Sequence, residues 1–105
     1  ELFNIELDKI AVKGKKDAIR IFTDLGNNDW VFKNTNWYFN QQQHDKFLVL
    51  YRQQSWESAE LFANDLRASW PEMAGYYGVM IDRIREYKEN PPGDSWDGVY
   101  RAETK

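Results

Sequence analysis

The side chains of this chain that could do chemistry are few and scattered. His44 is the only histidine, there is no cysteine, and four serines stand where turns, helix caps or surfaces are expected: Ser55, Ser58, Ser69 and Ser95. Acidic and basic residues alternate over residues 82–89, which is typical of a solvated helix face with pairs three or four residues apart. No carboxylates have the spacing of metal ligands and no serine lies in a nucleophile elbow. The sequence therefore predicts no catalytic residue and no metal site in this chain.

Composition excludes several further classes of function. The formal net charge is -3, the sequence pI is about 5.1, and the basic residues are interspersed with acids. No basic face is offered to phosphate backbones, so nucleic acid is not expected as a partner. The longest apolar run, residues 47–51, is far shorter than the roughly 20 residues that span a bilayer, so this segment should not insert into a membrane. The lack of cysteine is compatible with a reducing compartment, and we expect a cytoplasmic location.

The elements that must position any site begin with a hairpin. Apolar residues alternate with polar ones over residues 2–25 on both sides of Gly14, which predicts two strands joined around residues 12–17. A lone hairpin is marginally stable in water. We therefore expect it to join a larger sheet, as a part of a longer protein would.

Three helices are predicted downstream. Helical periodicity indicates a first helix over residues 36–53, a second over residues 56–70 with Ser55 as its N-cap, and a third over residues 73–88. Pro71 separates the second from the third, and Pro91 and Pro92 end the third. Short connections predict antiparallel neighbours. The inward faces are Phe47, Leu50 and Tyr51; Trp56, Ala59, Phe62, Ala63, Leu66 and Trp70; and Tyr77, Met80, Ile81, Ile84 and Tyr87.

The tail carries an unexpected tryptophan. Trp96 follows two prolines and a Gly-Asp turn, so the chain can reverse and lay the indole against the aromatic faces of the helices. We expect Trp96 to be buried, with Val99 and Tyr100 beside it. The alternative is that residues 97–102 add an edge strand to the hairpin.

Residues 51–71 resemble the second half of a tetratricopeptide repeat (TPR), with a ring at the end of one helix, a ring and a small residue opening the next, and a closing proline. The resemblance fails upstream, at Gln43, Lys46 and Phe47. It implies that the concave side of the first helix binds a partner; by register these candidate residues are Gln41, His44, Leu48, Tyr51 and Arg52. The alternative is that these residues form a solvated face or are covered by the tail. One repeat cannot bury its own face, so the third helix is expected to cap it.

A second resemblance lies in residues 6–22, ELDKIAVKGKKDAIRIF. This stretch is similar to the last β-hairpin of the catalytic domain of class III adenylate and guanylate cyclases, with the pattern Leu-Asp-x-Ile-x-Val-Lys-Gly-Lys followed by Ile-x-Ile-Phe. The helical remainder, with YRQQSWESAELF and the ending NPPGDSWDGVY, resembles the C-terminal extension that follows this domain in bacterial cyclases. The resemblance covers most of the chain.

The cyclase resemblance implies one binding residue here. In the family, the lysine of Val-Lys-Gly-Lys contacts the terminal phosphates of the nucleotide, and Lys13 stands at that position; the alternative is that Lys13 is only a solvated hairpin residue. The metal-binding aspartates and the transition-state Asn and Arg would lie upstream of residue 1, so Mg or Mn is expected for the parent protein and no cofactor for this fragment. Its partners would be the remainder of the parent chain, with a homodimer formed through that parent. An upstream region could anchor the parent in a membrane.

Together these features predict a mainly α (α+β) fold, with an N-terminal β-hairpin, a TPR-like antiparallel helix pair, a third packing helix and a docked extended tail. Residues 1–26 would end a cyclase catalytic domain and residues 27–105 would form a helical C-terminal domain. The expected function is the non-catalytic C-terminal part of a nucleotide cyclase, supporting or regulating catalysis. The alternatives are an independent TPR-like protein-interaction module and a structural cap that shields the cyclase core.

Overall fold

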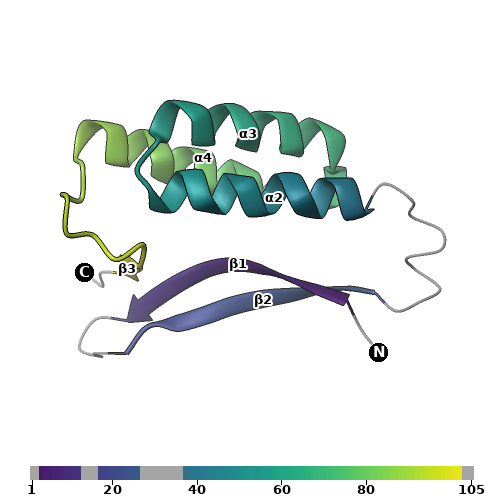
Figure 1. Ribbon diagram of the computed structural model, residues 1–105, viewed down its shortest axis with the longest axis horizontal. Helices are drawn as coiled ribbons and strands as arrows, with labels where there is room; N and C mark the ends of the chain where they lie inside the picture. Colours follow the sequence, from purple (N-terminus) through teal and green to yellow (C-terminus); the bar gives the residue numbers. More distant parts are fainter. Residues whose placement is uncertain (1–2, 13–16, 27–36, 103–105) are drawn as a thin grey trace. The chain divides into compact units, whose positions relative to one another are not determined.

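A computed structural model describes residues 3–12, 17–26 and 37–102 (Figure 1). The described elements are three α-helices, one 3-10 turn and three strands, which confirms the predicted mainly α (α+β) fold with an N-terminal hairpin. In chain order they are β1 (Phe3–Val12), β2 (Ile19–Gly26), α2 (Trp37–Arg52), α3 (Trp56–Ser69), η1 (Pro71–Met73), α4 (Ala74–Glu89) and β3 (Tyr100–Ala102).

The chain forms two compact units. One contains the hairpin together with Asp97–Lys105, and the other is the helical unit Asn36–Trp96. The sequence predicts a helical domain over residues 27–105; in the part of this range that the structure describes, Trp37–Trp96 belong to the helical unit and Asp97–Ala102 are grouped with the strands. That residues 1–26 end a cyclase catalytic domain stays a prediction.

The sheet is built around β1. Strand β1 pairs antiparallel with β2, for example Ile10 with Ile19 and Ile5 with Thr23, and parallel with β3, where Ile10 faces Tyr100. The strand order is therefore β2-β1-β3. The alternative in which the tail adds a strand to the hairpin is confirmed, over Tyr100–Ala102.

The burial of side chains in the sheet follows this strand order. Ile5 and Ala11 on the central strand are buried, whereas Ile19 and Phe22 on β2 are exposed. Across the strands Arg20 donates two hydrogen bonds of 3.0 Å to the Glu6 carboxylate, and its guanidinium lies 5.1 Å from the Phe22 ring centroid. Such cross-strand pairs are the local interactions that hold an antiparallel hairpin in register.

The three helices begin and end close to the predicted residues. Gln54 has a φ of 64°, which no right-handed helix contains, so it separates α2 from α3. Ser55 stands at the N-cap position of α3, but its side chain makes no capping hydrogen bond. Pro71 ends α3 because proline has no amide hydrogen and its ring clashes with the preceding turn, and it opens the 3-10 turn that leads into α4.

Helix α3 packs against both neighbours within the helical unit. Ala59 and Ala63 are fully buried on it, and small side chains let adjacent helices approach closely. On α4 the predicted inward residues Tyr77, Met80, Ile81 and Ile84 are all buried. Helical spacing of apolar residues thus identified most of the packed faces, although the predicted inward residues Leu50, Trp56, Phe62 and Tyr87 are half-buried.

Trp96 closes the helical unit. Its indole contacts three rings, those of Tyr51, Trp56 and Tyr87, at centroid distances of 5.5, 5.7 and 5.2 Å. The Trp96 amide donates to the Gly93 carbonyl at 3.1 Å, in a turn where Gly93 has φ of 99°. Docking on the helices is as predicted, but the side chain is half-buried rather than buried. Val99 is buried, Tyr100 enters β3, and both are grouped with the sheet unit.

Candidate functional site

The predicted phosphate-binding residue Lys13 lies outside the described residues. The strands on either side of it are described: β1 ends at Val12, and Ile10 pairs with Ile19 on β2. The contact of Lys13 with nucleotide phosphates in a parent protein therefore stays a prediction.

His44, the centre of the predicted partner-binding face, is fully buried. Its Nδ1 forms a 2.7 Å hydrogen bond with the Tyr77 hydroxyl of α4. Its ring lies 5.7 Å from that of Tyr76 and 6.0 Å from that of Phe47, between centroids. Burial raises the pKa of Tyr77, and the nearby charge of Asp45 adds to the effect, so the hydroxyl stays protonated in the physiological range. His44 is thus a packed core histidine joining α2 to α4.

Tyr51 belongs to a second buried cluster. Its ring contacts Trp56 at 5.7 Å and Tyr87 at 6.3 Å, in addition to Trp96, and its hydroxyl oxygen accepts a 3.3 Å hydrogen bond from Arg83. Trp56 and Tyr87 stack at 5.0 Å. Rings in mutual contact fill the space between them, so this cluster is a packed core.

The remaining residues of the predicted face are Gln41, Leu48 and Arg52. Leu48 is buried, and Gln41 and Arg52 are half-buried. Three of the five predicted residues therefore offer no surface to a partner. That the accessible parts of Gln41 and Arg52 bind one stays a prediction.

The accessible apolar feature lies elsewhere on the helix pair. A groove between α2 and α3 contains two adjoining hollows of about 450 and 260 Å³. Phe62 lines both; Asp45, Lys46, Val49, Leu50 and Ser58 line the first, and Phe39, Gln43, Asp65, Leu66 and Ser69 line the second. This groove was not predicted from the sequence. Its signal was present in Phe39 and Val49, which place apolar residues on α2 outside the predicted stripe of Phe47, Leu50 and Tyr51.

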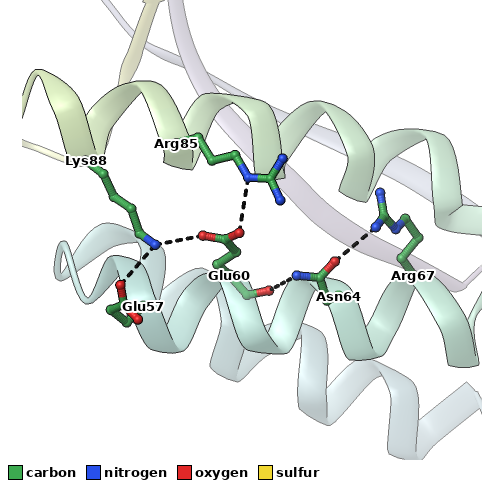
Figure 2. Close-up of polar contacts among 6 residues, drawn as sticks. All are labelled: Glu57, Glu60, Asn64, Arg67, Arg85 and Lys88. Atoms are coloured by element: carbon green, nitrogen blue, oxygen red, sulfur yellow. Dashed lines mark hydrogen bonds and ion pairs between the residues drawn. The ribbon is translucent and has the colours of Figure 1, made fainter.

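A polar network joins α3 to α4 on the surface of the helical unit (Figure 2). Lys88 of α4 donates to Glu60 at 2.8 Å and to Glu57 at 3.1 Å, and Arg85 donates to Glu60 at 3.2 Å. On α3 itself Asn64 donates to the Glu60 carbonyl and accepts from Arg67. The basic residues of α4 therefore pair across the helix interface, whereas the sequence analysis paired them within one helix.

These contacts shift two pKa values in opposite directions. The hydrogen bond from Lys88 is the largest cause that lowers the pKa of the Glu60 carboxyl; desolvation opposes it, and the weaker effect of the hydrogen bond from Arg85 adds to the lowering. Hydrogen bonds to Glu60 and then to Glu57 raise the pKa of the Lys88 ammonium. Both groups are charged at neutral pH, so their ion pair stabilises the contact between α3 and α4. Neither Glu60 nor Lys88 has a pKa shifted towards neutral pH, as a proton-transfer group would need.

Within the described ranges, no group of three or more His, Asp or Glu residues is arranged to hold a metal ion. The helices described here are also too short or too polar to cross a membrane. Comparison with protein families, with curated proteins and with solved structures finds no match for this chain. The function must therefore be argued from the residues themselves.

Proposed function

We propose that this chain is the C-terminal, non-catalytic part of a class III nucleotide cyclase and that its helical unit supports or regulates the catalytic domain. The observation that carries the proposal is the hairpin. The Leu-Asp-x-Ile-x-Val part of the pattern lies on β1 and the Ile-x-Ile-Phe part lies on β2, and these two strands pair antiparallel, as expected for a hairpin of this family.

The proposed role of Lys13 is electrostatic. Its position in the pattern, immediately after β1, would let its ammonium group contact the terminal phosphates of ATP or GTP. A cation there would stabilise the charge that develops on the leaving pyrophosphate. The metal ligands for Mg or Mn would come from upstream residues of the parent, so this chain alone should cyclise no nucleotide.

The proposed role of the helical unit is mechanical. Its core joins α2 to α4 through His44 and Tyr77, and its surface fastens α3 to α4 through Glu60 and Lys88. A unit held together in this way is suited to act as a support for a neighbouring domain. The alternative role, a TPR-like interaction module that uses the predicted α2 face, has less support because His44, Leu48 and Tyr51 are buried.

The test of the proposal is cyclic nucleotide production by the full-length parent protein. We expect turnover from ATP or GTP with Mg or Mn, and altered turnover when residues 27–105 are removed at matched folded concentration. A full-length parent that makes no cyclic nucleotide from either substrate would overturn the proposal. A truncated parent with unchanged turnover would reduce the helical unit to a cap without a role in catalysis.

A single substitution sharpens this test. Lys13→Ala in the parent should lower kcat/KM by about 100-fold, as loss of one preorganised charge-stabilising group does. Lys9→Ala is the matched control, because Lys9 is a lysine of β1 that lies outside the Val-Lys-Gly-Lys motif. Equal effects of the two substitutions would argue against phosphate binding by Lys13.

A further inference from the structure

The groove between α2 and α3 has the regular form of a helix-packing surface. Its lining residues recur at intervals of four, three and four on both helices: Phe39, Gln43, Lys46 and Leu50 on α2, and Ser58, Phe62, Asp65 and Ser69 on α3. This is the spacing of one continuous helix face. The stretch from Phe39 to Leu50 covers about 16 Å at about 1.5 Å per residue, or three helical turns. The groove is therefore long enough to receive a helix along its whole length.

Apolar side chains in the groove and beside it are exposed to solvent. Val49 is 53% exposed and Leu61 is 66% exposed, and Phe39 is exposed as well. Val49 lines the first hollow, and Leu61 is the neighbour of the lining residue Phe62 on α3. An exposed apolar strip of this kind, bordered by polar residues, is typical of an interaction surface.

The charges of the groove identify its occupant. Asp45 and Lys46 on α2 and Asp65 on α3 are all exposed, so the same groove carries both signs of charge. A partner with one sign of charge would satisfy some of these groups and be repelled by the others. A second copy related by a two-fold axis presents the same groups in reverse order, so Lys46 of each copy can meet the partner's Asp45 or the partner's Asp65.

We infer that this groove is the interface through which two copies of the chain associate. Each copy contributes the antiparallel pair α2 and α3, and the two pairs face one another as a four-helix arrangement. Phe39, Val49, Leu50 and Phe62 form its apolar centre, and reciprocal pairs of Lys46 with aspartates set its register. The inference is independent of the cyclase proposal, because it uses only the helical unit and concerns association rather than turnover.

The first test is the mass of the chain in solution by sedimentation equilibrium. We expect a reversible dimer of twice 12.5 kDa. Val49→Glu should raise the dissociation constant by at least about 100-fold, because it places an unpaired carboxylate in the apolar centre. Val79→Glu is the matched control: Val79 is 58% exposed on α4, outside the groove, and its substitution should leave the dissociation constant unchanged. Equal helical circular dichroism of the three proteins verifies that each is folded.

The second test reverses the charges. Lys46→Asp leaves the groove with acidic groups only, and the double change Asp45→Lys with Asp65→Lys leaves it with basic groups only. Each variant alone should associate at least about tenfold more weakly than the wild type. An equimolar mixture should form the heterodimer, because the two grooves then carry complementary charge. Recovery on mixing is specific to contact between two copies of this groove.

Three outcomes would overturn the inference. The first is a wild-type chain that stays monomeric up to about 1 mM, including one whose groove binds an unrelated helix instead. The second is a dimer that Val49→Glu leaves intact, which would place the interface elsewhere, for instance along the exposed strand β2. The third is a failure of the two charge-reversed variants to associate on mixing. None of these outcomes bears on cyclic nucleotide production by the parent.

Discussion

His44 and Tyr77 meet from helices α2 and α4, 33 residues apart in the chain, in the interior of the helical unit. Each brings a polar atom into a region walled by aromatic rings, where an unsatisfied hydrogen-bonding group is costly. Their 2.7 Å hydrogen bond satisfies both groups and fixes the register of the two helices. A polar pair among rings is therefore a local determinant of how α4 lies on α2.

Removing both members of this pair should cost less than the sum of the two single losses. Tyr77→Phe deletes only the hydroxyl and should lower the free energy of unfolding by about 1–2 kcal/mol, because it withdraws the hydroxyl partner of His44 Nδ1. Chemical denaturation measures this loss. In a double-mutant cycle with His44→Leu, the two losses should add to more than the loss in the double variant. Strict additivity would mean that the hydrogen bond does not couple the residues.

Trp96 carries the second prediction at this scale. The indole touches the rings of Tyr51, Trp56 and Tyr87 but is only half-buried. Trp96→Ala should therefore cost about 2 kcal/mol, less than the 3–5 kcal/mol typical of a fully buried tryptophan. Thermal unfolding measures the loss, with Val79→Ala at an exposed site as control. An unchanged melting temperature for Trp96→Ala would mean that the indole does not support the helices.

The sequence predicted the surroundings of Trp96 better than those of His44 and Tyr51. The docking of Trp96 follows from its position after two prolines and a turn, which is local information. The burial of His44 and Tyr51 does not, because it depends on α4, whose residues Tyr77 and Tyr87 are more than 30 positions away. A TPR-like register assigned these residues to an open concave face, and the packing of α4 against them closes it.

At the scale of elements, helix pairing in this unit combines an apolar interface with a charged edge. The small residues Ala59 and Ala63 are fully buried on α3. At the edge, Glu60, with a side chain only 18% exposed, receives hydrogen bonds from both Arg85 and Lys88 of α4. Pairs that lie partly out of water are screened less by salt than fully exposed ones. The charged edge thus complements the apolar contact and favours one relative position of the two helices.

The shifted pKa of Glu60 makes the stability of this helix pair depend on pH. Because its pKa is lower in the folded chain than the usual 4.5, its contribution is present above that value and is lost as the pH falls through the folded pKa. The pKa of Lys88 is raised above 10.5, so its contribution is lost only as the pH rises through that higher value. The Glu60–Lys88 pair should therefore stabilise the folded chain fully between the two ordinary pKa values, from about pH 4.5 to about pH 10.5.

Urea unfolding at pH 7 and pH 3 should reveal this dependence. Glu60→Gln should lower the unfolding midpoint at pH 7 and have a smaller effect at pH 3, which lies below the usual pKa of 4.5, so the carboxyl of the unfolded chain is protonated and the contribution of Glu60 is already reduced. Glu57→Gln is the matched control, since Glu57 is 90% exposed and shares only Lys88, so its effect should be smaller. An effect of Glu60→Gln that is the same at both pH values would contradict the assigned pKa shift.

The elements themselves were largely predictable. The first helix was expected over residues 36–53 and spans Trp37–Arg52, and the third was expected over residues 73–88 and spans Ala74–Glu89. Apolar periodicity and the prolines determine both. Strand β3 was only an alternative, because three residues carry little alternation and their partner Ile10 lies at the other end of the chain. The α2–α3 groove was missed for a different reason: its outline depends on how two helices pack, which no single helix pattern contains.

At the scale of the whole molecule, the two units depend on the chain ends in different ways. The helical unit Asn36–Trp96 is continuous in sequence, whereas the sheet unit needs residues from both ends of the chain. A two-stranded hairpin is marginal in water and a third strand stabilises it. The C-terminal residues are therefore part of the structural requirement of the N-terminal hairpin.

Removal of residues 97–105 should separate the two units experimentally. Amide hydrogen exchange in β1 and β2 should accelerate, because β1 loses its parallel partner β3, while the amides of α2, α3 and α4 should keep their protection. Deletion of residues 103–105 alone is the control and should leave β1 protected. Faster exchange throughout the helices would instead show that the helical unit needs the tail for its own stability.

The parallel pairing of Ile10 with Tyr100 also sets an order of events during synthesis. A ribosome releases the two hairpin strands and the whole helical unit before it releases β3, and at the usual rate of about 5–20 residues per second the interval from residue 27 to residue 102 lasts about 4–15 s. Over that interval the edge of β1 that later pairs with β3 lacks this partner, and an open strand edge is a template for pairing with other nascent chains. The addition of β3 to the sheet therefore follows synthesis of the helical unit, and crowded ribosomes on one message are where its failure would lead to aggregation.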